Sequence, residues 1–116
     1  MPIPNAQSAF IPPEKLTQYL LNVTHPVGSP KARWFMSLGY HPDNPDQLGV
    51  DLLDIVRKSS DYVDEVTEFG VKYTVRGRLE SPNGSLVHVR SVWITETATP
   101  QPRLVTAYPD KEPENE

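Results

Sequence analysis

The chain contains no cysteine. This excludes disulfide bridges, thiolate zinc sites and thiol catalysis, and it favours a reducing compartment. The sequence also lacks an apolar run near the roughly 20 residues that a membrane helix needs, and it lacks the basic and then apolar start of a secretory signal. We therefore expect a cytoplasmic protein with no membrane partner.

Motifs of several common site types are also absent. The sequence has no glycine-rich phosphate loop and no Gly-x-Ser-x-Gly elbow of the kind that holds a nucleophilic serine. Its three histidines are scattered, without the close spacing that metal-ligating histidines show. We expect neither a metal nor another cofactor.

The charge is negative overall but unevenly distributed. With 116 residues the chain suffices for one domain, and its net charge of -4 argues on average against a nucleic-acid partner. Residues 42–69 are strongly acidic, whereas residues 70–109 carry more lysine and arginine than acid. Two interpretations stay open: ordinary solvated faces, or one basic surface that joins the C-terminal part of the chain to a loop around Lys31.

The first half of the chain has helical periodicity. Apolar residues recur at helical spacing, and Gly39 and Asn44 are placed as an end and a start signal. This pattern predicts helices over residues 12–23, 30–38 and 45–58, the last with Asn44 as its cap and Pro45 at its first position.

Beyond residue 60 apolar and polar residues alternate, which is typical of strands. The predicted strands are 62–68, 71–76, 86–95 and 103–108, with a loop over 97–102. Helices followed by strands in this order predict an α+β domain over residues 1–109, with the helices packed on one face of a four-stranded antiparallel sheet. Residues 110–116 are predicted to be a disordered acidic tail.

Residues 25–35 combine basic side chains with a predicted helix start. Ser29 suits the N-cap and Pro30 the first helical position, so free backbone N–H groups would lie beside Lys31 and favour an anion. His25 is the best acid/base candidate, because an unperturbed pKa of about 6.5 lets histidine exchange a proton at neutral pH. The alternative is that His25 only hydrogen-bonds its own turn.

The predicted strand 86–95 places different residues on its two faces. Ser91 and Trp93 share one face, and Arg90 lies on the other. Trp93 is either core filler beside an incidental hydroxyl, or it stacks a base while Ser91 binds a phosphate, as RNA-cleaving sites require. Further phosphate-binding and hydroxyl groups on the predicted sheet are Arg76, Arg78, Arg90, Thr106 and Tyr108.

Four segments resemble an uncharacterised family of small bacterial domains, of the type called domain of unknown function 6883. They are residues 3–6, residues 25–28 together with 31–32, residues 89–93 and residues 102–109. Members of that family are similar to modules that occur as stand-alone proteins and at the ends of polymorphic toxins.

A second resemblance concerns the order of elements and a few side chains. Helices before a four-stranded sheet, with an N-terminal His and Lys and a Ser-x-Trp on a central strand, are similar to the metal-independent ribonuclease toxins of the barnase, EndoU, colicin and RelE group. Colicin-D-like tRNases use a histidine, a lysine and a Ser-x-Trp pair, which implies site roles for His25, Lys31, Ser91 and Trp93.

The leading hypothesis is a metal-independent ribonuclease toxin that acts on RNA, with tRNA as a candidate, by general acid/base transesterification. Its predicted catalytic residues are His25, Lys31, Arg90 and Ser91, and its predicted substrate-binding residues are Arg76, Arg78, Trp93, Thr106 and Tyr108. An antitoxin or immunity protein would be its partner. The rival hypothesis is a non-catalytic interaction module of a toxin or antitoxin system, which binds a protein through its acidic third helix and an exposed sheet edge.

Overall fold

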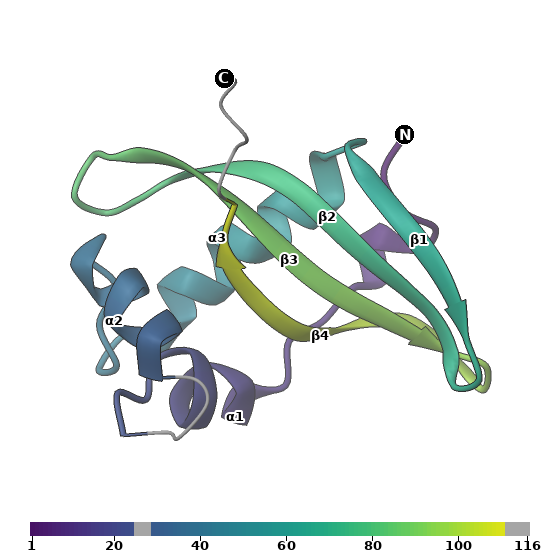
Figure 1. The fold of residues 1–116 in the computed structure, drawn as a ribbon, viewed down its shortest axis with the longest axis horizontal. Coiled ribbons are helices and arrows are strands. Elements are labelled where there is room, and N and C mark those ends of the chain that lie inside the picture. The colour runs from purple at the N-terminus through teal and green to yellow at the C-terminus, as the bar shows by residue number, and fades with distance from the viewer. Residues whose placement is uncertain (25–28, 111–116) are drawn as a thin grey trace.

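The computed structural model of the chain describes residues 1–24 and 29–110. In these described residues, five helical segments precede four strands (Figure 1). The helical segments are η1 (Ala6–Ser8), α1 (Pro13–Lys15), η2 (Leu16–Leu20), α2 (Ser29–Ser37) and α3 (Pro45–Lys58). The strands are β1 (Tyr62–Thr67), β2 (Gly70–Glu80), β3 (Leu86–Glu96) and β4 (Thr99–Pro109). The predicted α+β fold, with its helices before an antiparallel sheet, is confirmed.

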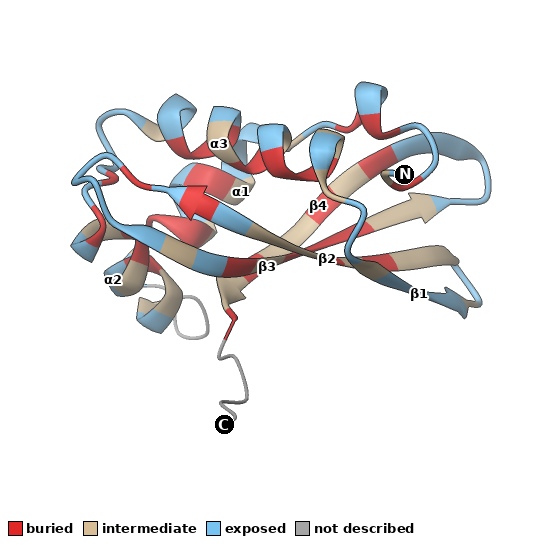
Figure 2. Cartoon of the chain, turned by 90° about the horizontal axis from the view of Figure 1, so that it is seen from above, coloured by how far each residue is buried: buried red, intermediate tan, exposed pale blue. Residues whose placement is uncertain are grey.

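The sheet is a meander in the order β1-β2-β3-β4, with every neighbouring pair antiparallel. Figure 2 shows α3 lying along one face, while α1 and α2 are grouped at one end of the molecule. Both of these shorter helices contact β4, and α3 contacts β2. The face of the sheet opposite α3 is called the open face below.

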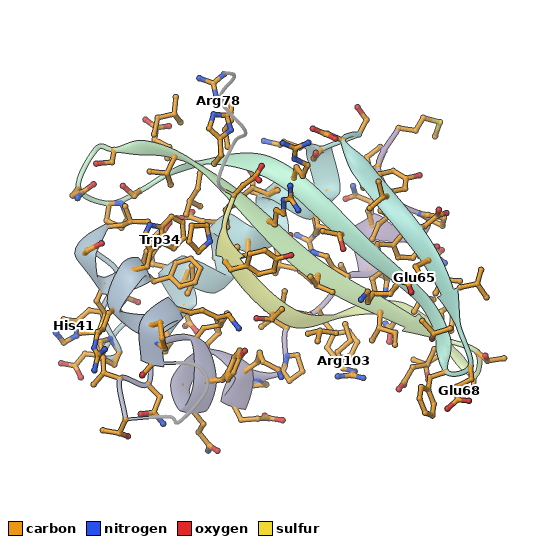
Figure 3. All side chains as sticks on the ribbon, viewed as in Figure 1. Trp34, His41, Glu65, Glu68, Arg78 and Arg103 are labelled. Atoms are coloured by element: carbon orange, nitrogen blue, oxygen red, sulfur yellow. The ribbon has the colours of Figure 1, made fainter. Side chains whose placement is uncertain are left out.

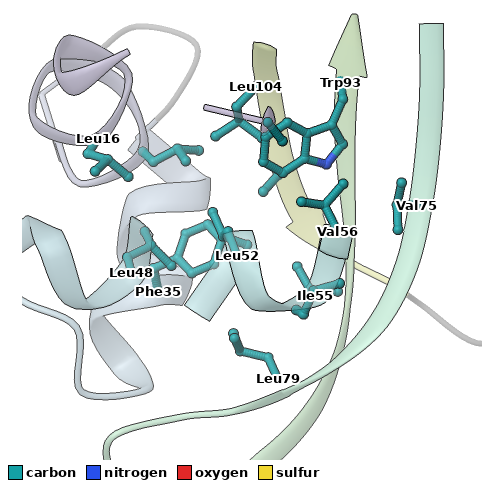
Figure 4. Close-up of a cluster of buried hydrophobic side chains, with 14 of the residues drawn as sticks. Leu16, Phe35, Leu48, Leu52, Ile55, Val56, Val75, Leu79, Trp93 and Leu104 are labelled. Atoms are coloured by element: carbon teal, nitrogen blue, oxygen red, sulfur yellow. The ribbon is translucent and has the colours of Figure 1, made fainter. Parts of the chain in front are cut away.

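The core lies between α3 and the sheet (Figure 4). The apolar stripe of α3 packs with Phe35 of α2 and with Trp93 and Leu104 of the sheet. At Gly77 of β2 an added Cβ would collide with Ile55 of α3, so a glycine is required for this close approach.

The first predicted helix is divided rather than continuous. A single α-helical turn runs into η2, a π-helical turn in which the Leu21 N–H donates to the Leu16 carbonyl at 2.9 Å. Short π-helical turns are uncommon and often occur at functional sites. This turn carries Tyr19, whose side chain is described below.

β4 begins earlier than the sequence pattern predicts. The predicted loop over 97–102 is wrong from Thr99 onward, because prolines 100 and 102 lie in an edge strand, where a missing N–H is tolerated. The N-terminal arm pairs with this edge: the Phe10 N–H donates to the Pro102 carbonyl at 2.9 Å, and the Leu104 N–H donates to the Phe10 carbonyl at 3.1 Å.

Two smaller predictions also differ from the structure. Pro45 takes the first helical position of α3 as predicted, but the side chain of Asn44 makes no capping hydrogen bond. Asp110, predicted to start the disordered tail, is buried with 8% of its surface exposed. Within the two described stretches, no helix has the length and apolar character needed to cross a membrane.

Candidate functional site

Alternation along three strands gathers predicted site residues on the open face. Val75, Val89 and Ala107 point into the core, so Arg76, Arg90 and Tyr108 point the other way. The register places Arg76 opposite Arg90, and Arg90 opposite Tyr108. Thr106, two residues before Tyr108, shares this face.

Lys31 reaches the same side of the sheet through Tyr19. Its Nζ donates a hydrogen bond of 2.7 Å to the hydroxyl of Tyr19, which lies 3.3 Å from the Oγ1 of Thr106. Because Thr106 pairs with Val92 on β3, Arg90 is its diagonal neighbour, at a backbone separation of about 7–8 Å. Elements α2, η2, β4 and β3 therefore bring an ammonium, a phenol, a hydroxyl and a guanidinium together.

Tyr19 is the residue that sequence reasoning missed. It lies in the apolar stripe of the first predicted helix, so its periodicity indicates packing and gives no sign of a site. Burial raises the pKa of its phenol, but hydrogen bonds with Lys31 and Thr106 and the charges of Lys31 and Lys15 outweigh that effect and leave the pKa below its usual value. The two ammonium groups lie 5.1 and 5.0 Å from the centre of its ring.

Asp110 joins two arginines at the centre of the open face. Its carboxylate accepts hydrogen bonds from Nε of Arg90 at 2.8 Å and from Nε of Arg76 at 3.0 Å. Burial raises the pKa of Asp110, but the two arginines outweigh burial and hold the pKa below its usual value. The carboxylate thereby fixes the orientation of Arg90, whose terminal nitrogens carry the N–H donors suited to a phosphate.

Two depressions flank Asp110. One, of about 410 Å³, is lined by Arg90, Tyr108, Pro109 and Asp110. The other, of about 420 Å³, lies where β2 continues beyond the end of β1, and its lining includes Arg76, Arg78 and His88. Figure 3 shows Arg78 at the margin of the sheet, away from Arg103 near β4. Of the predicted arginines, Arg76 and Arg90 are thus central and Arg78 is peripheral.

Ser91 and Trp93 do not belong to the open face. Both are 0% exposed, and the indole N–H of Trp93 donates to the Ser91 hydroxyl at 2.8 Å inside the core. A fully buried indole offers no face on which a base stacks, so the substrate-binding role predicted for Trp93 is corrected to core packing. The Ser91 hydroxyl satisfies the indole, which removes it from the predicted catalytic set.

His25 lies outside the described residues. Of the other histidines, His41 accepts a hydrogen bond from the backbone of Asp43 at 3.1 Å, and His88 is exposed on β3. In the part of the chain that the structure describes, no group of three or more His, Asp or Glu side chains is arranged to hold a metal ion.

The fold and the arginines on its open face define a small α+β domain with a basic surface. The chain belongs to the family described as Domain of unknown function (DUF6883), whose profile matches residues 2–111. This confirms the family resemblance. A search of curated proteins finds no match.

Among solved structures, the chain is similar to one in the contact-dependent growth inhibition toxin-immunity protein complex from Klebsiella pneumoniae 342. The TM-score is 0.72 at 14% sequence identity, and the match covers 93% of this chain and 98% of that chain. At such low identity the likeness establishes a shared fold.

Proposed function

We propose that this chain is a metal-independent ribonuclease of the toxin type. The observation that carries the proposal is the convergence of Lys31, Thr106, Tyr108 and Arg90 on the open face, from three elements distant in sequence. Such a set supplies two cations for a phosphate and two hydroxyls for a sugar-phosphate backbone.

The proposed reaction is a transesterification at one RNA phosphate. The ribose 2′-oxygen attacks phosphorus as its proton passes to a base, the P–O5′ bond breaks, and the leaving 5′-oxygen takes up a proton. The products are a 2′,3′-cyclic phosphate and a 5′-hydroxyl. Lys31 and Arg90 stabilise the negative charge of the phosphorane. The sequence assigns to His25 one of the two proton transfers, either from the 2′-hydroxyl or to the leaving oxygen.

Local charge supports an RNA substrate better than the net charge of the chain does. Lys15, Lys31, Arg76 and Arg90 stand on this side against the carboxylate of Asp110. The carboxylates of Asp54 and Asp61 line the depression at Arg76, whereas Asp110 is the acidic residue that lines the depression at Arg90.

A proteinaceous inhibitor is the partner that this function implies. The solved structure of similar fold contains a growth inhibition toxin together with an immunity protein. A ribonuclease that attacks RNA in the cell that makes it requires such a partner, so we assign a cognate immunity or antitoxin protein to this chain as well.

Cleavage of bulk RNA and of tRNA by the purified protein in EDTA tests the proposal. We expect products ending in 2′,3′-cyclic phosphate, and growth arrest on induced expression. Arg90→Met should lower the cleavage rate about 10²–10³-fold, the usual effect of removing one donor to transition-state charge. Lys31→Met should act in the same direction.

Arg103→Met is the matched control, because Arg103 forms its ion pair with Glu96 at 3.3 Å, toward the other end of β4. It should cleave at the wild-type rate. Intact RNA with the wild-type protein, together with normal growth, would overturn the proposal.

One observation favours a second function, a non-catalytic interaction module of a toxin or antitoxin system. The edge of the sheet at β1 exposes large apolar side chains, with Val63 69%, Val66 84% and Phe69 66% accessible. Exposed apolar residues on an edge strand favour binding to another protein. This function would be established instead if the wild-type protein leaves RNA intact and binds the protein encoded by the neighbouring gene, and if Val66→Lys abolishes that binding.

A further inference from the structure

We propose that Tyr19 is the general acid of the reaction and donates its phenolic proton to the leaving 5′-oxygen. This inference rests on the proposed function and deepens it, because it assigns the second proton transfer to a residue that sequence reasoning placed in the apolar stripe of a helix. The inference is based on the position of the Tyr19 phenol in η2.

The Tyr19 hydroxyl lies between Lys31 of α2 and Thr106 on the open face. Lys31 donates to it at 2.7 Å, so the phenol oxygen acts as an acceptor and its own hydrogen is directed elsewhere. Thr106, at 3.3 Å, is one acceptor for that hydrogen. A leaving oxygen bound beside Thr106 and Arg90 would lie within reach of the same O–H group.

The chemistry of a phenol flanked by ammonium groups suits an acid. In the transfer the O–H bond of Tyr19 breaks, its proton joins the 5′-oxygen, and the electron pair stays on the phenolate. Lys31 and Lys15 stabilise that phenolate by hydrogen bonding and charge, and this stabilisation grows as the proton leaves. Solvent reprotonates the phenolate after the products depart.

The groups that set the proton affinity of Tyr19 come from three elements packed around it. They are Lys15 on α1, Lys31 on α2 and Thr106 on β4, and their combined effect lowers the pKa of the phenol despite its partial burial. The rate should therefore fall on the alkaline side, where Tyr19 loses its proton, and replacing Lys31 should move that limb to higher pH.

A pair of substrates tests the assignment. One is a dinucleotide with the natural 5′-oxygen leaving group, and the other carries a bridging 5′-sulfur, whose thiolate leaves without a proton. Tyr19→Phe should slow cleavage of the oxygen substrate about 10²–10⁴-fold, the usual contribution of general acid/base catalysis, and should leave the sulfur substrate near the wild-type rate. The alkaline limb of the pH profile should also disappear.

Tyr62→Phe, on β1, is the matched control and should cleave both substrates like the wild type. If Tyr19→Phe slows both substrates equally, Tyr19 only positions the substrate and the assignment is overturned. It is equally overturned if the variant keeps the wild-type rate on the oxygen substrate, and in both cases the proposed function stands. Failure of the wild-type protein to cleave either substrate overturns the proposed function itself.

A titration without RNA measures the pKa of the Tyr19 phenol directly. The near-ultraviolet titration of the wild type minus that of Tyr19→Phe should show one phenolate forming below the usual pKa of tyrosine, and Lys31→Met should raise it. A difference titration at or above the usual pKa contradicts the role of Lys31 in stabilising the phenolate and overturns the assignment. Unchanged circular dichroism would show that Tyr19→Phe keeps its fold.

Discussion

The two faces of β3 carry polar residues with opposite roles. On the face toward α3, Ser91 and Trp93 are fully buried and bonded to each other. On the open face, Arg90 is partly exposed and is held by Asp110 across from Tyr108. Arg90 and Ser91 are adjacent in sequence, yet Ser91 belongs to the core and Arg90 to the open face.

Only some of the polar residues on β3 are available to a ligand. A buried hydrogen bond such as that between Ser91 and Trp93 satisfies groups that would otherwise be costly to bury, and it leaves no donor for a substrate. A guanidinium held by one of its nitrogens keeps the others for a phosphate. Polarity alone therefore does not identify the site on this strand.

The largest effect is expected from truncation on the core face. Trp93→Ala should lower the free energy of unfolding by about 3–5 kcal/mol, because it leaves a large cavity among Val56, Val75 and Leu104. Arg90→Ala, on the other face, should cost about 1 kcal/mol, since its guanidinium is partly solvated. Urea denaturation measures the free energy of unfolding of both variants. Equal losses would contradict the expected difference between the two faces of β3.

Ser91→Ala should have an intermediate effect. It removes the acceptor of the buried indole N–H and should cost about 1–3 kcal/mol of unfolding free energy. If the proposed function holds, the folded fraction should cleave RNA at the wild-type rate, because the lost hydroxyl faces the core. If a well-folded Ser91→Ala protein cleaves RNA at a strongly reduced rate, the Ser91 hydroxyl has a catalytic role after all.

Asp110→Asn should have a smaller, pH-dependent effect on stability. The pKa of Asp110 in the folded protein lies below its usual value, so the carboxylate stabilises the fold above the unfolded-state pKa. That stabilisation, about 1–2 kcal/mol, is lost as the pH falls through the folded-state pKa. Wild type and variant should therefore differ most near neutral pH, begin to converge below about pH 4, and agree once the pH lies below the folded-state pKa.

Asp54→Asn is the control for this pH dependence. Asp54 pairs with Lys58 on the exposed surface of α3 at 2.9 Å, and its replacement should change stability little at any pH. Denaturation midpoints across the acidic range give the comparison. A constant difference between wild type and Asp110→Asn down to the lowest pH would show that Asp110 acts through packing rather than charge.

The smallest effect is expected at the C-terminus. Residues 111–116 contain no Leu, Ile, Val, Met or aromatic side chain, so a chain ending at Asp110 should keep its melting temperature. A chain ending at Pro109 should melt lower, because it also loses the contacts of Asp110 with Arg76 and Arg90. Equal melting temperatures for these two chains would show that the contacts of Asp110 with Arg76 and Arg90 do not stabilise the fold.

The element order of this protein is determined by local pattern. The change from helical to alternating periodicity near residue 60 predicts helices before strands, because each period matches one way of burying an apolar face. Gly39, whose φ of 104° suits glycine, ends the α2 segment as predicted. Where local signals mislead, as at prolines 100 and 102, the cause is the tertiary arrangement, because β4 is an edge strand in which a missing N–H is tolerated.

Local pattern also establishes that Ser91 and Trp93 share a face and that Arg90 lies on the other, because side chains alternate along a strand. Which of the two faces packs against α3 depends on the tertiary structure. It alone brought the phenol of Tyr19 to Lys31 and Thr106 and placed Asp110 between two arginines. Periodicity is a property of neighbouring residues, whereas a site of this kind is built from segments up to 87 residues apart, whose meeting depends on how the whole core packs.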